Sequence, residues 1–218
     1  MTGERTIAKA RAESLWTPLE QIRSRGMAID YVSAVRHLRE TGEQLTVSEL
    51  IYLQQRIGED GGPFAIPQSV AQFFSHLIGY RRCGRILDPS GGFGLLGAWL
   101  AGTLPVERVD VISSRASIVD IVTPLNLKTL RIHVGTLGGA AADLDSQYDA
   151  IVASPPVGLR SEKRSVWIDG DQCDLVDDPS RLLIAELAPR LTSEGFLAFV
   201  VTPTFARPVV PSRQVRVP

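Results

Sequence analysis

Residues able to do chemistry gather in two short stretches, each placed directly after an apolar run. The first stretch reads Asp88-Pro-Ser-Gly-Gly-Phe-Gly94 and follows the apolar residues Ile86 and Leu87. Glycines in such a turn let the backbone approach a bound molecule closely, and a helix that begins there presents free N–H groups. The carboxylate of Asp88 suits a cationic group such as an amine, because it would repel a phosphate. The turn predicts a ligand site, with a plain tight turn as the simpler alternative.

The same glycines leave a second kind of ligand open. Gly92-Phe-Gly94-Leu-Leu-Gly97 matches the G-x-G-x-x-G pattern of dinucleotide sites, and Ser113-Ser114-Arg115 could hold the 2′-phosphate of NADP. An NADP-dependent oxidoreductase is therefore an alternative. It lacks an evident catalytic pair, because no tyrosine lies near any of the lysines in sequence: Lys9, Lys128 and Lys163.

The second stretch, Ser154-Pro155-Pro156-Val157, follows the apolar run 150–153. Neither proline has an N–H group, so the proline carbonyls and the Ser154 oxygen form a cluster of acceptors. Acceptors of this kind suit an NH2 group that must be held and kept electron-rich. A strand-ending turn is the simpler alternative, and the position of the stretch downstream of the glycine turn favours the site.

The elements that would position these stretches alternate between strand and helix from residue 84 onward. We predict strands over 85–88, 108–112, 130–134, 149–153 and 196–201. Helices are predicted over 95–104, 118–127 (interrupted near Pro124) and 181–191. Strands separated by helices predict an α/β fold with a doubly wound parallel sheet. In such a sheet the ligand lies beyond the carboxyl ends of the strands, where both stretches are placed.

The rest of the chain divides into a helical start and an irregular end. Residues 1–61 contain no convincing strand, and we expect two or three amphipathic helices there, one of them beginning at Thr46 or Ser48. A further helix is predicted over 68–80. The α/β domain is expected to span 62–205, and the tail 206–218 to be irregular.

Three motifs in this order resemble those of the adenine-N6 DNA methylases, most closely the modification subunits of type I restriction systems. The motifs are Gly62-Pro-Phe64-Ala-Ile66-Pro67, Asp88–Gly94 and Ser154–Val157. The resemblance covers about residues 27–205 and implies the Rossmann-like fold of class I S-adenosylmethionine-dependent methyltransferases. It implies S-adenosylmethionine as cofactor and a flipped adenine amine in double-stranded DNA as methyl acceptor.

The resemblance also implies roles for individual residues. Cofactor binding is expected from Phe64, Ile66, Pro67, Asp88, Pro89, Ser90, Gly92, Gly94, Ser113 and Thr136. The catalytic motif is Ser154, Pro155, Pro156 and Val157. A loop beside the DNA would contact phosphates through Arg160, Lys163 and Arg164.

Four positions depart from the family pattern. Ile66 replaces a threonine, Val157 replaces the aromatic residue that stacks on the base, and two acids are replaced by Ser113 and Thr136. Stacking on an aromatic side chain is worth about 1–3 kcal/mol per base. A catalytically inactive protein of the same fold, binding DNA or a partner, is therefore a further alternative.

The remaining sequence features limit which partners and which cellular compartment are expected. No apolar run is long enough to span a membrane, and a net charge of −1 excludes a polycation. Cys83 and Cys173 are expected to be free thiols in the cytoplasm, and no metal site is predicted; the acidic stretch 171–178 is expected to be a solvated loop. Because the chain ends soon after the fifth predicted strand, we expect a specificity subunit or a missing C-terminal region to complete it.

Overall fold

The computed structural model describes residues 2–26, 29–57, 66–136, 144, 147–154, 164–168, 171–175, 184 and 186–201. Four helices precede the first strand: α1 (Thr2–Ser24), α2 (Tyr31–Glu40), α3 (Val47–Ile57) and α4 (Gln68–Arg81). The first three confirm the predicted helical start of the chain. No helix among the described residues is long and apolar enough to cross a membrane.

The central sheet has five parallel strands in the order β3-β2-β1-β4-β7. They are β1 (Arg85–Asp88), β2 (Arg108–Ser113), β3 (Leu130–Val134), β4 (Tyr148–Ala153) and β7 (Leu191–Phe199). The chain moves from β1 outward to β3 and then returns to β4 on the other side of β1. The strand order therefore reverses between β1 and β4, which places the predicted ligand site at their carboxyl ends.

Two helical segments connect the first three strands. Helix α5 (Leu95–Thr103) joins β1 to β2, and α6 (Ile118–Val122) with the 3₁₀ helix η2 (Thr123–Leu125) joins β2 to β3. Pro124 lies at the start of η2. The predicted interruption of this helix near Pro124 is confirmed, because proline cannot donate the next intrahelical hydrogen bond.

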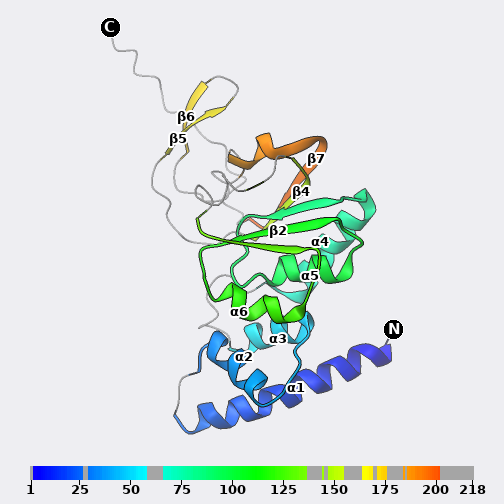
Figure 1. Ribbon diagram of the computed structural model, residues 1–218, viewed down its shortest axis with the longest axis vertical. Coiled ribbons are helices and arrows are strands. Elements are labelled where there is room, and N and C mark those ends of the chain that lie inside the picture. The colour runs from blue at the N-terminus through cyan, green and yellow to red at the C-terminus, as the bar shows by residue number, and fades with distance from the viewer. Residues whose placement is uncertain are drawn as a thin grey trace.

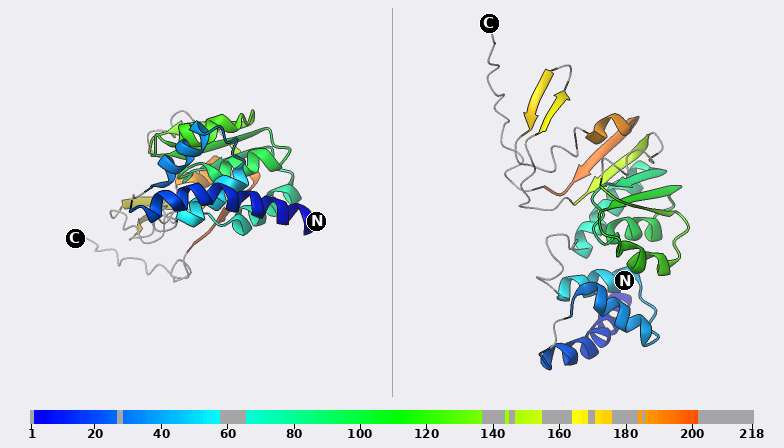
Figure 2. Two further views of the ribbon diagram at one scale, coloured as in Figure 1. Left: turned by 90° about the horizontal axis from the view of Figure 1, so that it is seen from below. Right: turned by 60° about the vertical axis from the view of Figure 1, so that its left-hand side comes forward.

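Apolar side chains cover both faces of the sheet, as a doubly wound fold requires. One face shares a single core with α1–α6, in which Leu19, Leu53, Ile86 and Val111 are fully buried. The other face buries a smaller cluster: Leu87, Ile112, Leu144, Tyr148, Ile151 and Leu187. Figure 1 shows α1–α3 beneath α5 and α6, with the sheet above them, and the right-hand view of Figure 2 shows the same order. The helical start thus packs as part of the same body as the sheet.

Helix α3 begins with a reciprocal cap. The Glu49 carboxylate accepts from the Thr46 backbone N–H at 2.7 Å, and the Thr46 hydroxyl accepts from the Glu49 N–H at 3.3 Å. Thr46 is therefore the cap, one of the two residues predicted. Arg11 of α1 donates to the same carboxylate at 2.6 Å and so ties α1 to the start of α3.

Two strands lie where the sequence was interpreted as loop. Strand β5 (Arg164–Ile168) pairs antiparallel with β6 (Asp171–Leu175). The loop interpretation of Arg164 and of the acidic stretch 171–175 was wrong. Asp169-Gly170 separates the two strands, and Asp-Gly directly after the β-branched and aromatic residues 166–168 is a hairpin signal that outweighs the charges.

The last strand also begins earlier than predicted, at Leu191 instead of Phe196. Tyr148 pairs with Leu191 and Ala150 pairs with Phe196, so the register is irregular between these pairs. Gly195 lies at this irregularity, where an added Cβ would stand 2.9 Å from the Tyr148 carbonyl oxygen. Residues 192–195 lay between the helix predicted over 181–191 and the strand predicted over 196–201 and were assigned to neither. The helix predicted over 181–191 is helical at 184 and 186–187, and 3₁₀ over Ala188–Arg190.

Candidate functional site

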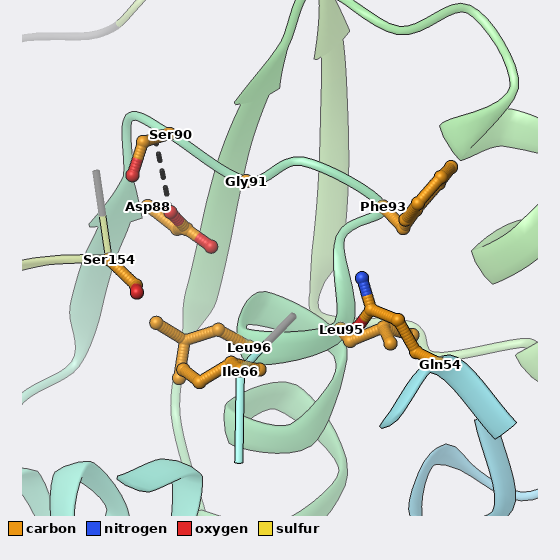
Figure 3. Close-up of a pocket in the computed structure, with 9 residues that line it drawn as sticks. All are labelled: Gln54, Ile66, Asp88, Ser90, Gly91, Phe93, Leu95, Leu96 and Ser154. Carbon is orange, nitrogen blue, oxygen red and sulfur yellow. Dashed lines mark hydrogen bonds between the residues drawn. The ribbon is translucent and has the colours of Figure 1, made fainter. Parts of the chain in front are cut away.

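A pocket lies at the carboxyl ends of β1 and β4, at the point where the strand order reverses. Four of the predicted residues line it together: Ile66, Asp88, Ser90 and Ser154. The other lining residues are Gln54, Gly91, Phe93, Leu95 and Leu96. Figure 3 shows Asp88, Ser90 and Ser154 on one side, Gln54 and Phe93 on the other, and Ile66 with Leu96 between them.

The glycine turn packs closely against β2. The Gly91 N–H donates to the Ile112 carbonyl oxygen at 2.9 Å. A Cβ at Gly91 would lie 2.1 Å from Val111 Cγ1, and a Cβ at Gly97 would lie 2.1 Å from Val111 Cγ2. Gly94 caps α5 with a left-handed φ of 77°, a conformation that favours glycine. The sequence analysis named Gly92 and Gly94 but missed Gly91, whose neighbour Val111 only the fold reveals.

Ser113 holds this turn in place. Its hydroxyl donates to the Gly92 carbonyl oxygen at 2.6 Å and accepts from the Arg115 N–H at 3.0 Å. The side chain is buried, and Ser113 does not line the pocket. The hydroxyl proton is therefore used within the protein, which distinguishes this residue from an acid that could accept from ribose hydroxyls.

Three other predicted residues are not among those that line the pocket. Pro89 is buried in the turn itself, between the lining residues Asp88 and Ser90. Pro67 is exposed as the N-cap of α4, and Thr136 is exposed just after β3.

Asp88 is a buried carboxylate with one oxygen unused. Its side chain is 1% exposed, and Oδ1 accepts from the Ser90 N–H at 3.2 Å. Oδ2 has no hydrogen-bond partner among the residues that the structure describes. Burial raises the pKa of this carboxyl from 3.8 to about 7, against the lowering effect of the Ser90 and Gly97 backbone N–H groups. A buried polar atom without a partner costs about 1–3 kcal/mol, which a ligand donor would recover.

Gln54 enters the pocket from α3, in the helical start of the chain. It is 1% exposed, and its Oε1 has no hydrogen-bond partner within the described part of the chain. The sequence analysis missed this residue. A usable signal was present, because Gln54 shares the buried face of α3 with the apolar residues Leu50, Leu53 and Ile57.

Phe93 of the glycine turn packs against the helical start of the chain. Its ring packs on the Tyr31 ring with centroids 4.7 Å apart, and the Arg115 guanidinium lies 4.8 Å from the Phe93 centroid. The Tyr31 hydroxyl in turn donates to the Leu50 carbonyl oxygen of α3 at 3.1 Å. Burial raises the pKa of Tyr31, so this phenol stays protonated as a donor.

The pocket thus combines an apolar floor with unpartnered oxygen atoms. Three oxygen atoms of its lining residues are buried and lack partners in the described ranges: Asp88 Oδ2, Ser90 Oγ and Gln54 Oε1. Buried polar groups are normally hydrogen-bonded, so three such oxygens in one pocket call for a ligand that carries N–H or O–H donors. The carboxylate favours a ligand with a positive charge.

Several predicted site residues lie outside the described residues, and their roles stay predictions: Phe64, Pro155, Pro156, Val157, Arg160 and Lys163. Arg164 begins β5. Within the described part of the chain, no group of three or more His, Cys, Asp or Glu residues is placed to hold a metal ion.

Comparison with known proteins rests on structure, because no protein-family model and no curated protein sequence matches the chain. A methyltransferase from Geobacter sulfurreducens is similar, with a TM-score of 0.52 and 15% identity over 80% of this chain and 79% of that one. An rRNA methylase from Streptococcus thermophilus has a TM-score of 0.41, with 14% identity over 59% of this chain and 68% of that one. Coclaurine N-methyltransferase, bound to N-methylheliamine and SAH, has a TM-score of 0.40, with 15% identity over 60% of this chain and 35% of that one.

The likeness to the Geobacter protein, together with the strand order, decides the fold. This chain has the Rossmann-like fold of class I S-adenosylmethionine-dependent methyltransferases. The fold class predicted from the sequence is confirmed. At 15% identity the likeness extends to the fold alone, so ligand and activity rest on the pocket.

Proposed function

We propose that this chain binds S-adenosylmethionine in the pocket at the ends of β1 and β4 and transfers its methyl group to an amine. The observation that carries the proposal is the buried Asp88, whose Oδ2 faces the pocket without a partner. The ammonium group of S-adenosylmethionine is a cation with hydrogen-bond donors, which such an oxygen accepts well. Ser90 and Gln54 offer further acceptors, and Ile66 with Leu96 offers apolar contact.

The bound cofactor would supply an electrophilic methyl group on a positively charged sulfur, and the chain would bring an acceptor to it. Ser154 lines the same pocket at the end of β4. Its oxygen can accept a hydrogen bond from an amine N–H and so help to aim the nitrogen lone pair at the methyl group. Positioning of this kind lowers the activation barrier for methyl transfer, and it does not require the protein itself to give up or take on a charge.

The finer proposal is that the amine is N6 of an adenine in double-stranded DNA. It rests on the resemblance of Ser154–Val157 to the motif of adenine-N6 DNA methylases. The base would leave the duplex stack, and the Pro155 carbonyl would join Ser154 in holding its amine. Arg160, Lys163 and Arg164 would contact phosphates, with a specificity subunit or further region of chain reading the sequence.

An NADP-dependent oxidoreductase remains the competing function, and one observation favours it. Gly97 packs tightly against Val111, as the third glycine of a dinucleotide-binding pattern packs its helix on the strand. Asp88 opposes it, because an ionised carboxylate lining the pocket would repel a pyrophosphate.

A protein that binds the cofactor without turning it over is the second competitor. Ser113, at the end of β2, uses its hydroxyl to hold Gly92. No acid therefore stands at this position to accept from ribose hydroxyls, so binding would be weakened.

Calorimetric titration with S-adenosylmethionine, with NADPH in parallel, tests the proposal. We expect saturable binding of S-adenosylmethionine. Asp88→Asn should weaken this binding at least about tenfold, because it removes a charged hydrogen bond. Gly91→Val should abolish binding by pushing the turn away from Val111, with circular dichroism as the check on folding. Binding of NADPH instead of S-adenosylmethionine would overturn the proposal.

Transfer of a labelled methyl group to adenine-containing duplex DNA tests the finer proposal. Incorporation that Ser154→Ala reduces would support adenine methylation. Cofactor binding without incorporation into DNA would favour the inactive form or a different amine acceptor. Val157→Phe should then strengthen DNA binding if loss of the stacking residue is the cause.

A further inference from the structure

We infer that Gln54 contacts the bound ligand, so that α3 of the helical start forms one wall of the site. The inference rests on the proposed function for the identity of that ligand. It concerns a residue outside the three sequence motifs, in a segment that the sequence places before the α/β domain. Three observations lead to it: the burial of Gln54, its unpartnered oxygen and its place opposite Asp88.

Packing alone does not account for a glutamine at this position. The neighbouring residues of the buried face of α3, Leu50, Leu53 and Ile57, are apolar and almost completely buried. An apolar side chain of the same length would fill the same space and leave no polar atom unpaired. Gln54 instead lines the pocket, and its buried Oε1 has no hydrogen-bond partner among the described residues. A buried polar side chain without a partner among apolar neighbours conflicts with the demands of packing, and such a conflict is typical of a functional position.

The position of Gln54 in the pocket complements that of Asp88. Figure 3 shows Gln54 across the pocket from Asp88 and Ser154, with the amide turned toward the space between them. The two polar side chains therefore stand on opposite walls of the pocket. Because the amide is neutral, Gln54 adds an acceptor for a ligand N–H or O–H without adding a second negative charge.

Contacts on both sides of Gln54 hold this wall in place. The Thr46–Glu49 cap fixes the start of α3. Four residues before Gln54, the Leu50 carbonyl oxygen accepts from the Tyr31 hydroxyl, and the Tyr31 ring packs on Phe93 of the glycine turn. The same aromatic contact thus connects α3 with the turn that approaches the ligand. A side chain held in this way can contribute to binding without first being ordered.

The sharpest variant is Gln54→Met, which keeps the length of the side chain and removes its hydrogen-bonding groups. Gln55→Met is the matched control, because Gln55 is the next residue of α3 and is exposed. The measurements are the dissociation constant of S-adenosylmethionine by calorimetry and the melting temperature of each ligand-free protein. We expect Gln54→Met to weaken binding about tenfold, the worth of one buried hydrogen bond, and to leave the ligand-free melting temperature unchanged or higher. Gln55→Met should match the wild type in both.

The other outcomes separate this inference from the proposed function. Wild-type affinity in Gln54→Met would overturn the role of Gln54 and leave the proposed function standing. The same affinity with a lower ligand-free melting temperature would assign Gln54 to the core alone. Absence of S-adenosylmethionine binding in the wild type would overturn both.

Discussion

Two buried aspartates on neighbouring strands have opposite surroundings. Asp110 of β2 is 2% exposed, and its Oδ1 lies 2.9 Å from His133 Nε2 of β3. Its Oδ2 accepts from the Tyr148 hydroxyl at 2.9 Å and pairs with Arg108 Nε at 2.8 Å. Asp88 of β1 is as deeply buried, yet its carboxylate is contacted by backbone N–H groups alone among the described residues, those of Ser90 and Gly97, and its Oδ2 has no hydrogen-bond partner there.

The two carboxylates also lie on opposite faces of the sheet. Asp110 lies on the face of Ile112 and Tyr148, where its partners join β2, β3 and β4. Asp88 ends β1 on the face of Ile86, next to the pocket. Burial, together with the neighbouring Asp110, raises the pKa of Tyr148 and keeps its hydroxyl a donor. A buried charge alone therefore does not point to a ligand site. The observation that sets Asp88 apart from Asp110 is the unpartnered oxygen of a carboxylate that lines the pocket.

Removal of the satisfied carboxylate should have the largest effect. Asp110→Ala removes the acceptor of the buried Tyr148 hydroxyl and one ion-pair partner of the partly buried Arg108, so we expect a loss of about 3–5 kcal/mol in the free energy of unfolding. Urea denaturation measures it. Asp120→Ala, at an exposed aspartate of α6, is the control and should change stability by less than about 0.5 kcal/mol. A small effect of Asp110→Ala would remove the contrast between the two aspartates.

Removal of the unsatisfied carboxylate should act in the opposite direction. The folded pKa of Asp88 is about 7, above the ordinary 3.8, so wild-type stability falls as pH rises between these values. Asp88→Asn avoids this loss, and the gain should reach up to about 4 kcal/mol at pH 8 and be smaller at pH 5. Urea denaturation at both pH values checks it. An equal gain at both would show that charge burial is not its origin, and a loss at pH 8 would contradict the prediction outright.

The smallest expected effect concerns the link between β2 and the glycine turn. Ser113→Ala removes the hydrogen bond to the Gly92 carbonyl, which should cost about 1 kcal/mol of stability. Because the turn lines the pocket, S-adenosylmethionine binding should weaken as well. Ser114→Ala, at the exposed neighbour, serves as the control for both measurements. Unchanged binding in Ser113→Ala would show that the turn keeps its shape without this contact.

Much of the architecture was predictable because its signals are local. Short apolar runs ending in Asp88-Pro89 and Ser154-Pro155 predict strands, since proline and glycine stop regular structure within a few residues. The helix interrupted at Pro124 and the Thr46 cap follow from the same kind of short-range chemistry. The β5–β6 pair was predictable too from Asp169-Gly170, but this signal was not used, because the stretch was interpreted as loop from its charged residues alone.

The amino-acid sequence by itself determined the parallel α/β fold and the place of its two motifs at the ends of strands. Three things were decided only by the tertiary structure: the contact of Ser113 with Gly92, the collision that a side chain at Gly91 would have with Val111, and the entry of Gln54 into the pocket. Each depends on residues about 20 or more positions apart in the chain. Periodicity and turn chemistry reach only a few residues, whereas the partner of a buried polar atom is set by how whole elements pack.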